Sequence, residues 1–173
     1  GIRYEIPDHI VEALNKEMYE FKIKYKTRFK LQKAIQRTIT QIGFNESGEG
    51  TGTMHDSIRI SAATGDLNKL YVTINAIFYY MFMDKGALLT NGGVIRPQFI
   101  TQKAIESPLG QEFISDAIGE YLVWMQANYP ILDVATINVT PDNIKLEITY
   151  NLFGADGGKW NGEFDYATNW NNF

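Results

Sequence analysis

Residues suited to acid–base chemistry are few in this chain of 173 residues. His9 and His55 have no acid or nucleophile at the spacing of a catalytic motif, so we interpret both as surface or helix-start residues. Asp84 follows the apolar run 78–83, where burial would perturb a carboxyl group. We favour a structural carboxylate satisfied by backbone amides or an arginine. Carboxylates are numerous enough that composition also leaves a glycosidase pair open.

The sequence contains no motif that would bind a metal, a nucleotide or a dinucleotide. It has no cysteine, which excludes disulfides and cysteine-based zinc or redox sites. The glycine loop 48–52 lies beside Glu46 and Glu49, whose charges would repel phosphate, so we interpret it as a linker. We therefore expect no catalytic residue, no cofactor and no metal site.

Basic residues are concentrated in one run near the N-terminus, residues 22–37, which we call the basic stripe. Residues 22–37 hold seven bases and no acid, whereas residues 106–173 hold ten acids and two bases. Interleaved aromatic rings would allow this run to bind nucleic acid through phosphate contacts and stacking. Because the chain as a whole is acidic, with a pI near 5.2, we favour a protein contact or a solvated face. The contact residues predicted here are Lys26, Lys30 and Lys33.

The C-terminal segment 153–173 combines aromatic rings with glycine and asparagine. Aromatic rings flanked by amides are typical of sugar-binding surfaces and equally of protein interfaces. We favour an interface, because the segment has almost no aliphatic residues with which to build its own core. We expect an extended arm that docks on a neighbouring subunit through Trp160, Tyr166 and Trp170.

Hydrophobic spacing predicts a helix that begins near Pro7 and ends at Gly43. Within it, residues 21–31 alternate apolar and basic side chains, which is the period of a strand. We prefer a helix there because the flanking segments are helical and no turn signal brackets the run. Residues 100–128 predict further helix, interrupted at 108–110, with the longer part starting near Gln111.

Strands are predicted at 57–63, 69–76, 135–139 and 143–151, with the first two forming an antiparallel hairpin. The run 78–83 is too short to distinguish a buried strand from a helix, and 88–94 reads as a loop. Phe78, Tyr79, Phe82 and Phe99 are the expected core residues.

The predicted fold is therefore α+β, an antiparallel sheet of about four strands packed by an N-terminal helix and a longer helix in the C-terminal half. Residues 1–152 form the expected single domain, and 153–173 form the arm.

An ordered series of motifs between Thr51 and Ala104 is the most distinctive feature of the chain. A glycine turn comes first, then a hairpin, an aromatic run ending in acid and glycine, a glycine-rich loop, and a proline–aromatic step that opens a helix. The order is carried by Thr51, Gly52, Met54, Ser57, Ile58, Tyr79, Met83, Asp84, Gly86, Pro97, Phe99, Ile100 and Ala104. This order resembles the tail-completion, or neck, family of head–tail joining proteins in lambda-like tailed phages.

The resemblance implies a structural protein of the phage neck or tail that joins head and tail as a ring-forming subunit, and it implies no enzymatic activity. Expected partners are other copies of the chain in a ring and neighbouring connector and tail proteins. DNA would pass nearby without direct binding, and no membrane partner is expected. The chain would be made in the host bacterial cytoplasm and reside in the virion.

Two alternatives remain open. A tail terminator or a head-side stopper does similar work on the same particle. A carbohydrate-binding or hydrolytic tail module belongs to another class, and rests on the C-terminal aromatic residues and the carboxylates. The predicted contact residues are Lys26, Lys30, Lys33, Leu88, Leu89, Trp160, Tyr166 and Trp170.

Overall fold

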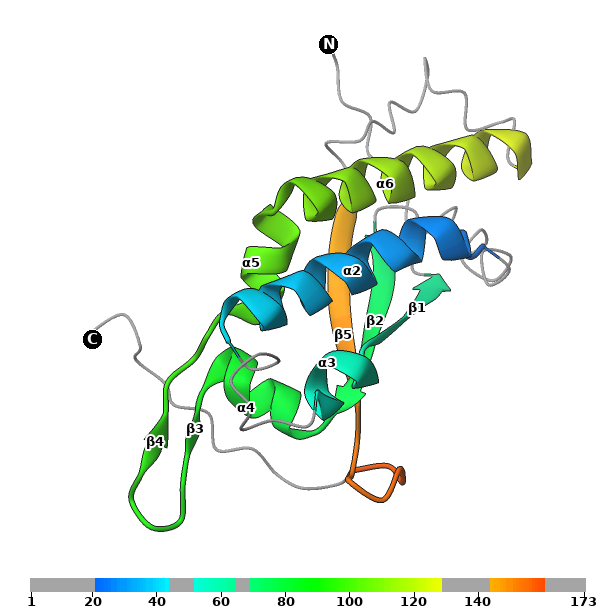
Figure 1. The fold of residues 1–173 in the computed structure, drawn as a ribbon. Helices are drawn as coiled ribbons and strands as arrows, with labels where there is room; N and C mark the ends of the chain where they lie inside the picture. The colour runs from blue at the N-terminus through cyan, green and yellow to red at the C-terminus, as the bar shows by residue number, and fades with distance from the viewer. Residues whose placement is uncertain (1–20, 44–51, 65–68, 129–143, 161–173) are drawn as a thin grey trace.

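The computed structural model describes residues 21–43, 52–64, 69–128 and 144–160 (Figure 1). Over these residues the chain is α+β, as predicted, with five helices, a mixed three-stranded sheet and a separate two-stranded hairpin. The predicted helix start near Pro7, the predicted strand 135–139 and most of the predicted arm lie outside the described residues.

The first described helix, α2, spans Tyr25–Gln41 and resolves the ambiguity at 21–31. Residues 21–24 are not helical, and the helical period takes over from Tyr25. Leu31, Ile35 and Ile39 recur at intervals of four and are fully buried, because residues at this spacing lie on one face of a helix. The helix prediction is therefore confirmed from Tyr25 onward.

Three strands form the main sheet: β1 (Arg59–Thr64), β2 (Lys69–Ile77) and β5 (Lys145–Phe153), in the order β1-β2-β5. β1 and β2 are antiparallel, as predicted, but β5 runs parallel to β2, so the prediction of an antiparallel sheet is wrong here. Parallel neighbours require a long crossover, and the chain from β2 to β5 passes through helices. Alternation of side chains identifies the buried face of a strand but not its direction.

Short elements precede β1 and follow β2. Helix α3 (Thr53–Ser57) precedes β1, and helix α4 (Tyr79–Lys85) follows β2. The segment predicted as a loop at 88–94 belongs instead to a hairpin of β3 (Ala87–Leu88) and β4 (Val94–Ile95). In Figure 1 this hairpin extends away from the sheet and the long helices.

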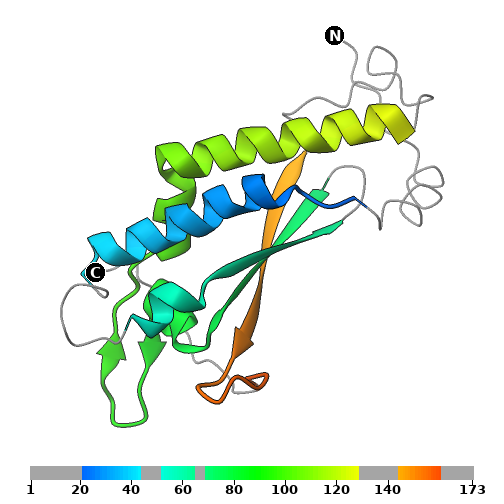
Figure 2. The ribbon, with the colours of Figure 1, turned by 45° about the vertical axis from the view of Figure 1, so that its right-hand side comes forward.

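The second helical region consists of two helices, as predicted, but the break lies at Ser107 and residues 108–110 are helical. Helix α5 spans Ile100–Glu106, and α6 spans Pro108–Asn128, starting one turn before the predicted Gln111. Proline suits the first turn of a helix, since the backbone N–H that it lacks has no partner there. Helix α6 lies alongside α2, and Figure 2 shows the two helices side by side after rotation.

The core lies between these helices and one face of the sheet. On β2, Leu70, Val72 and Ile74 are fully buried, whereas the alternating residues are half-buried. The core expected within 78–99 needs correction: Tyr80 is fully buried, Phe78, Tyr79 and Phe82 are half-buried, and Phe99 is 44% exposed. Because the run is a helix, its buried positions follow the helical period, which selects residues 80, 81 and 84.

Candidate interaction surfaces

A buried carboxylate holds the base of the hairpin. The Asp84 side chain is only 1% exposed. Its Oδ1 accepts the Thr101 backbone N–H at 3.0 Å, and its Oδ2 accepts the Thr101 hydroxyl at 2.9 Å. These bonds connect the end of α4, where the hairpin begins, to the first turn of α5, where the chain has returned from it. The prediction of a structural carboxylate satisfied by a backbone amide is confirmed.

Two tyrosines extend this polar cluster. The Tyr80 hydroxyl lies 2.7 Å from Thr101 Oγ1, and the Tyr150 hydroxyl donates to the same oxygen at 3.2 Å. Burial raises the pKa of Tyr80 well above its ordinary value, and the charge of Asp84 raises it further. The Tyr80 hydroxyl therefore stays neutral and can donate a hydrogen bond to Thr101 Oγ1. The cluster connects α4, α5 and β5, so three elements fix the orientation of the hairpin.

Backbone geometry at both ends of the hairpin completes this support. Gly86 has φ 79°, as predicted, a conformation that favours glycine. Phe99 has φ 51° and is the sole non-glycine residue with positive φ in the described ranges. Its N–H donates to the Asp84 carbonyl at 3.1 Å, and the Gln98 N–H donates to the Met83 carbonyl at 2.7 Å. The outgoing and returning chains are thus bonded directly to each other.

Exposed apolar side chains of the described residues are concentrated on the hairpin and its return to α5. Among the described residues six large hydrophobic side chains are exposed, and four of these lie within residues 88–99. They are Leu88, Leu89, Val94 and Phe99. We call these four residues the hairpin patch. Leu88 and Val94 pair across the hairpin, so they lie on the same face of it. The predicted contact residues Leu88 and Leu89 therefore lie on an exposed surface.

The predicted basic contact residues differ in their surroundings. Lys30 forms ion pairs with Glu112, at 2.7 Å, and with Asp116, both on α6. Hydrogen bonds to Asp116 and Glu112 raise the pKa of Lys30. Lys26 and Lys33 are exposed, and the Lys33 Nζ lies 5.5 Å from the centre of the Phe29 ring. Lys30 therefore joins two helices of one chain, whereas Lys26 and Lys33 face outward.

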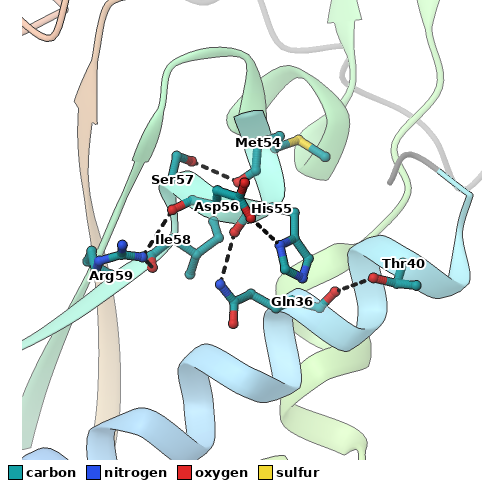
Figure 3. Close-up of polar contacts among 8 residues, drawn as sticks. All are labelled: Gln36, Thr40, Met54, His55, Asp56, Ser57, Ile58 and Arg59. Atoms are coloured by element: carbon teal, nitrogen blue, oxygen red, sulfur yellow. Dashed lines mark hydrogen bonds and ion pairs between the residues drawn. The ribbon is translucent and has the colours of Figure 1, made fainter. Parts of the chain in front are cut away.

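The polar groups around His55 form local hydrogen bonds within α3 and to α2 (Figure 3). His55 Nδ1 lies 2.8 Å from the Asp56 carboxylate, a pair between neighbours that the sequence analysis did not consider. The Ser57 hydroxyl donates to the Met54 carbonyl at 2.8 Å instead of to the histidine. Gln36 Nε2 donates to the His55 carbonyl at 3.1 Å. These contacts join α3 to α2 and end the short helix before β1.

The C-terminal aromatic residues are described only in part. A turn after β5 brings the Trp160 ring parallel to Phe78, with centroids 5.5 Å apart, and edge-on to Phe82 at 6.1 Å. Phe153, the first residue of the predicted arm, is the last residue of β5. Trp160 thus packs against α4, and against Phe78 just before it, within the same chain. Tyr166 and Trp170 lie outside the described residues.

Sequence reasoning gives no contact role to Phe99 or Val123. Phe99 is instead a predicted core residue. Val123, on α6, is 67% exposed. It occupies the face of α6 opposite to Tyr121, which is fully buried, and the helical period already separates these two positions.

Within the described ranges no helix is both long enough and apolar enough to span a bilayer. Three or more histidine or acidic side chains do not converge in a possible metal site anywhere in the part of the chain that the structure describes. No protein-family model, no curated protein and no solved structure matches this chain.

Proposed function

We propose that this chain is a structural protein of the phage neck or tail, a ring-forming subunit that joins head and tail. The observation that carries the proposal is a convergence. The motif residues of the resemblance support the hairpin and its return to α5, and this segment bears four of the six exposed large hydrophobic side chains in the described ranges. A firmly supported apolar projection is suited to docking, because little conformational entropy is lost when it binds.

The first half of the motif lies in and around α3 and connects this helix to the end of β2. Gly52 has φ 76° at the start of α3, a conformation that suits glycine. Met54 and Ile58 are buried in the core. The Ser57 hydroxyl accepts the Ile77 N–H at 3.2 Å, which connects α3 to the end of β2. This half of the motif therefore supports the point at which β2 leads into α4.

The second half supports the hairpin itself. Asp84 bonds to Thr101, Gly86 allows the chain to turn outward, and Ala104 is fully buried on the inner face of α5. The motif residues thus serve structure, as expected for a family defined by assembly. The partners we propose are other copies of the chain in a ring and neighbouring connector and tail proteins.

We propose that the chain does not bind directly to the DNA that would pass nearby. The internal ion pairs of Lys30 reduce the net charge of the basic stripe. Tyr166 and Trp170 stay predicted contact residues of the C-terminal segment. A tail terminator or head-side stopper would use the same supported hairpin, so either role is an alternative within the particle.

The carbohydrate-binding or hydrolytic alternative has less support. It rested on exposed aromatic rings, and one face of the Trp160 ring is covered by Phe78. A soluble-glycan binding assay compares wild type with Trp160→Ala and Trp170→Ala. Saturable binding that both substitutions abolish would favour the sugar module over the neck protein.

Assembly is the direct test of the proposed function. Mass photometry and negative-stain imaging of the purified chain should reveal closed rings. Leu88→Asp should reduce assembly, because it places a charge in the hairpin patch, while leaving the melting temperature nearly unchanged. Thr73→Asp, on the open face of the sheet, is the control and should assemble as wild type does. A chain that remains monomeric at all concentrations would contradict the proposal.

A further inference from the structure

We propose that the hairpin patch of one copy docks on the outer face of α6 of a second copy, centred on Val123. This inference rests on the proposed function in one respect, namely that the chain assembles with itself. It names which two surfaces meet, and the choice follows from exposure, charge and position in the fold.

Exposure leaves two candidate apolar partners for the hairpin patch. Apart from the patch, the exposed large hydrophobic residues in the described ranges are Tyr25, at 68%, and Val123, at 67%. Tyr25 starts α2 and stacks on Phe29, with ring centroids 5.9 Å apart. Val123 lies on α6, five residues before the helix ends at Asn128. Because Tyr25 and Val123 are almost equally exposed, exposure alone does not identify the partner of the hairpin patch.

Charge separates the two candidates. The segment 85–103, which contains the hairpin, holds three bases and no acid. Residues 22–28 around Tyr25 hold four bases and no acid, so this surface repels the hairpin. Helix α6 holds three acids and no base. Opposite potentials at an interface favour docking and like charges oppose it, so Val123 is the compatible partner.

Some of the acidic charge on α6 is already neutralised within the chain. Glu112 and Asp116 share the single positive charge of Lys30, which leaves one negative charge on this group of three. Glu120 lies one turn before Val123 on the same helix. The Glu120 carboxylate bonds to the start of α2. Helix α6 as a whole therefore keeps a net negative charge near the proposed contact, opposite in sign to Arg96 of the other copy's hairpin.

The outer face of α6 is also shaped for close approach. Ser115, Gly119 and Val123 follow one another at intervals of four residues and are all exposed, so they form one row. Space around Gly119 is open, since an added Cβ would meet nothing within 4 Å. The large residues of the helix, such as Phe113 and Tyr121, face the core. Neighbouring side chains therefore leave Val123 accessible.

Position decides the symmetry of the contact. The hairpin and α6 lie at opposite ends of the molecule in both Figure 1 and Figure 2. One copy cannot reach its own α6 with its own hairpin, and the two surfaces differ. A contact between two different surfaces is heterologous and repeats from copy to copy, which closes into a ring or continues as a filament.

Engineered cysteines provide the test, because the chain has none of its own. Leu88→Cys and Val123→Cys are purified separately, mixed at low salt and treated with a short bismaleimide crosslinker. We expect crosslinked dimers in the mixture at a yield well above that of either variant alone. The control mixture pairs Leu88→Cys with Tyr25→Cys, whose exposure matches that of Val123. Adding Arg96→Glu to the hairpin variant should lower the yield roughly fivefold or more.

Three results would overturn the inference. These are equal yields in the two mixtures, crosslinking of Val123→Cys with itself, and no crosslinking above background. Imaging of the same samples separates this failure from failure of the proposed function. Rings without the crosslink would leave the neck proposal standing with another contact surface. A crosslink without rings would support the contact and contradict the ring-forming subunit.

Discussion

Glu120 and Thr27 join two helices that lie far apart in the sequence. The Thr27 hydroxyl donates to Glu120 Oε2 at 2.5 Å, and the Lys24 N–H donates to Glu120 Oε1 at 2.9 Å. Lys24 is the N-cap of α2, and its side chain makes no capping bond. The carboxylate of α6 therefore supplies the acceptor and the negative charge that favour a helix N-terminus.

Glu120→Ala should destabilise the fold by about 1–2 kcal/mol, the usual effect of losing a helix cap. Chemical denaturation followed by circular dichroism measures the free energy of unfolding. Glu112→Ala makes the same change on the same helix and is the control. It should have little effect, since Lys30 keeps its bond to Asp116. Equal losses in the two variants would mean that the cap is not a special contact.

Thr101→Val should lower stability by about 1–3 kcal/mol, because the buried Asp84 carboxylate and the Tyr80 hydroxyl each lose a partner. Hydrogen exchange should rise at the hairpin, whose base this cluster holds. Thr149→Val is the matched control, since Thr149 bonds to Thr73 on the exposed face. A variant in which the hairpin amides keep their protection would disprove the anchoring role.

The two glycines of α6 should respond to alanine in opposite directions. At Gly110 an added Cβ would lie 2.0 Å from the Ala104 carbonyl oxygen, so alanine there must push α5 and α6 apart. At Gly119 the space is open, and alanine should stabilise the helix by about 0.5–1 kcal/mol. Thermal melting of the two variants measures both shifts. Similar melting temperatures of the two variants would contradict the close packing of α5 against α6 at Gly110.

Stability should fall as the pH rises above about 10, where an unperturbed tyrosine ionises. Burial raises the pKa of Tyr80 in the folded chain, so unfolding releases its proton in this range and high pH favours the unfolded state. Urea unfolding measured from neutral to alkaline pH should show the loss. Tyr80→Phe should flatten this dependence, whereas Tyr25→Phe, at an exposed position, should not.

Assembly should depend on the outward-facing part of the basic stripe. Lys26→Glu with Lys33→Glu should weaken self-assembly or docking while the free energy of unfolding changes little, because exposed charges contribute little to folding. Lys30 is left intact because it bonds to α6 within the chain. Assembly followed against salt concentration is the measurement. Normal assembly of the double variant at low salt would make the stripe a solvated face.

Local signals in the sequence were sufficient for much of the fold. The alternation in β2 identified its buried face, because successive side chains on a strand point to opposite sides. Gly86 was recognised as a position for positive φ, and the break near Pro108 was expected, since both depend on single residues. The resemblance also singled out Asp84 and Ala104, which proved to be buried.

The sequence by itself thus determined the type and place of most elements, because propensity and periodicity act over a few residues. Tertiary structure alone decided the direction of β5, the helical state of α4 and the ion pairs of Lys30. Each depends on a partner far away in the chain, as Glu112 is from Lys30. It also decided that residues 88–99 form an exposed projection, because burial depends on what else packs nearby.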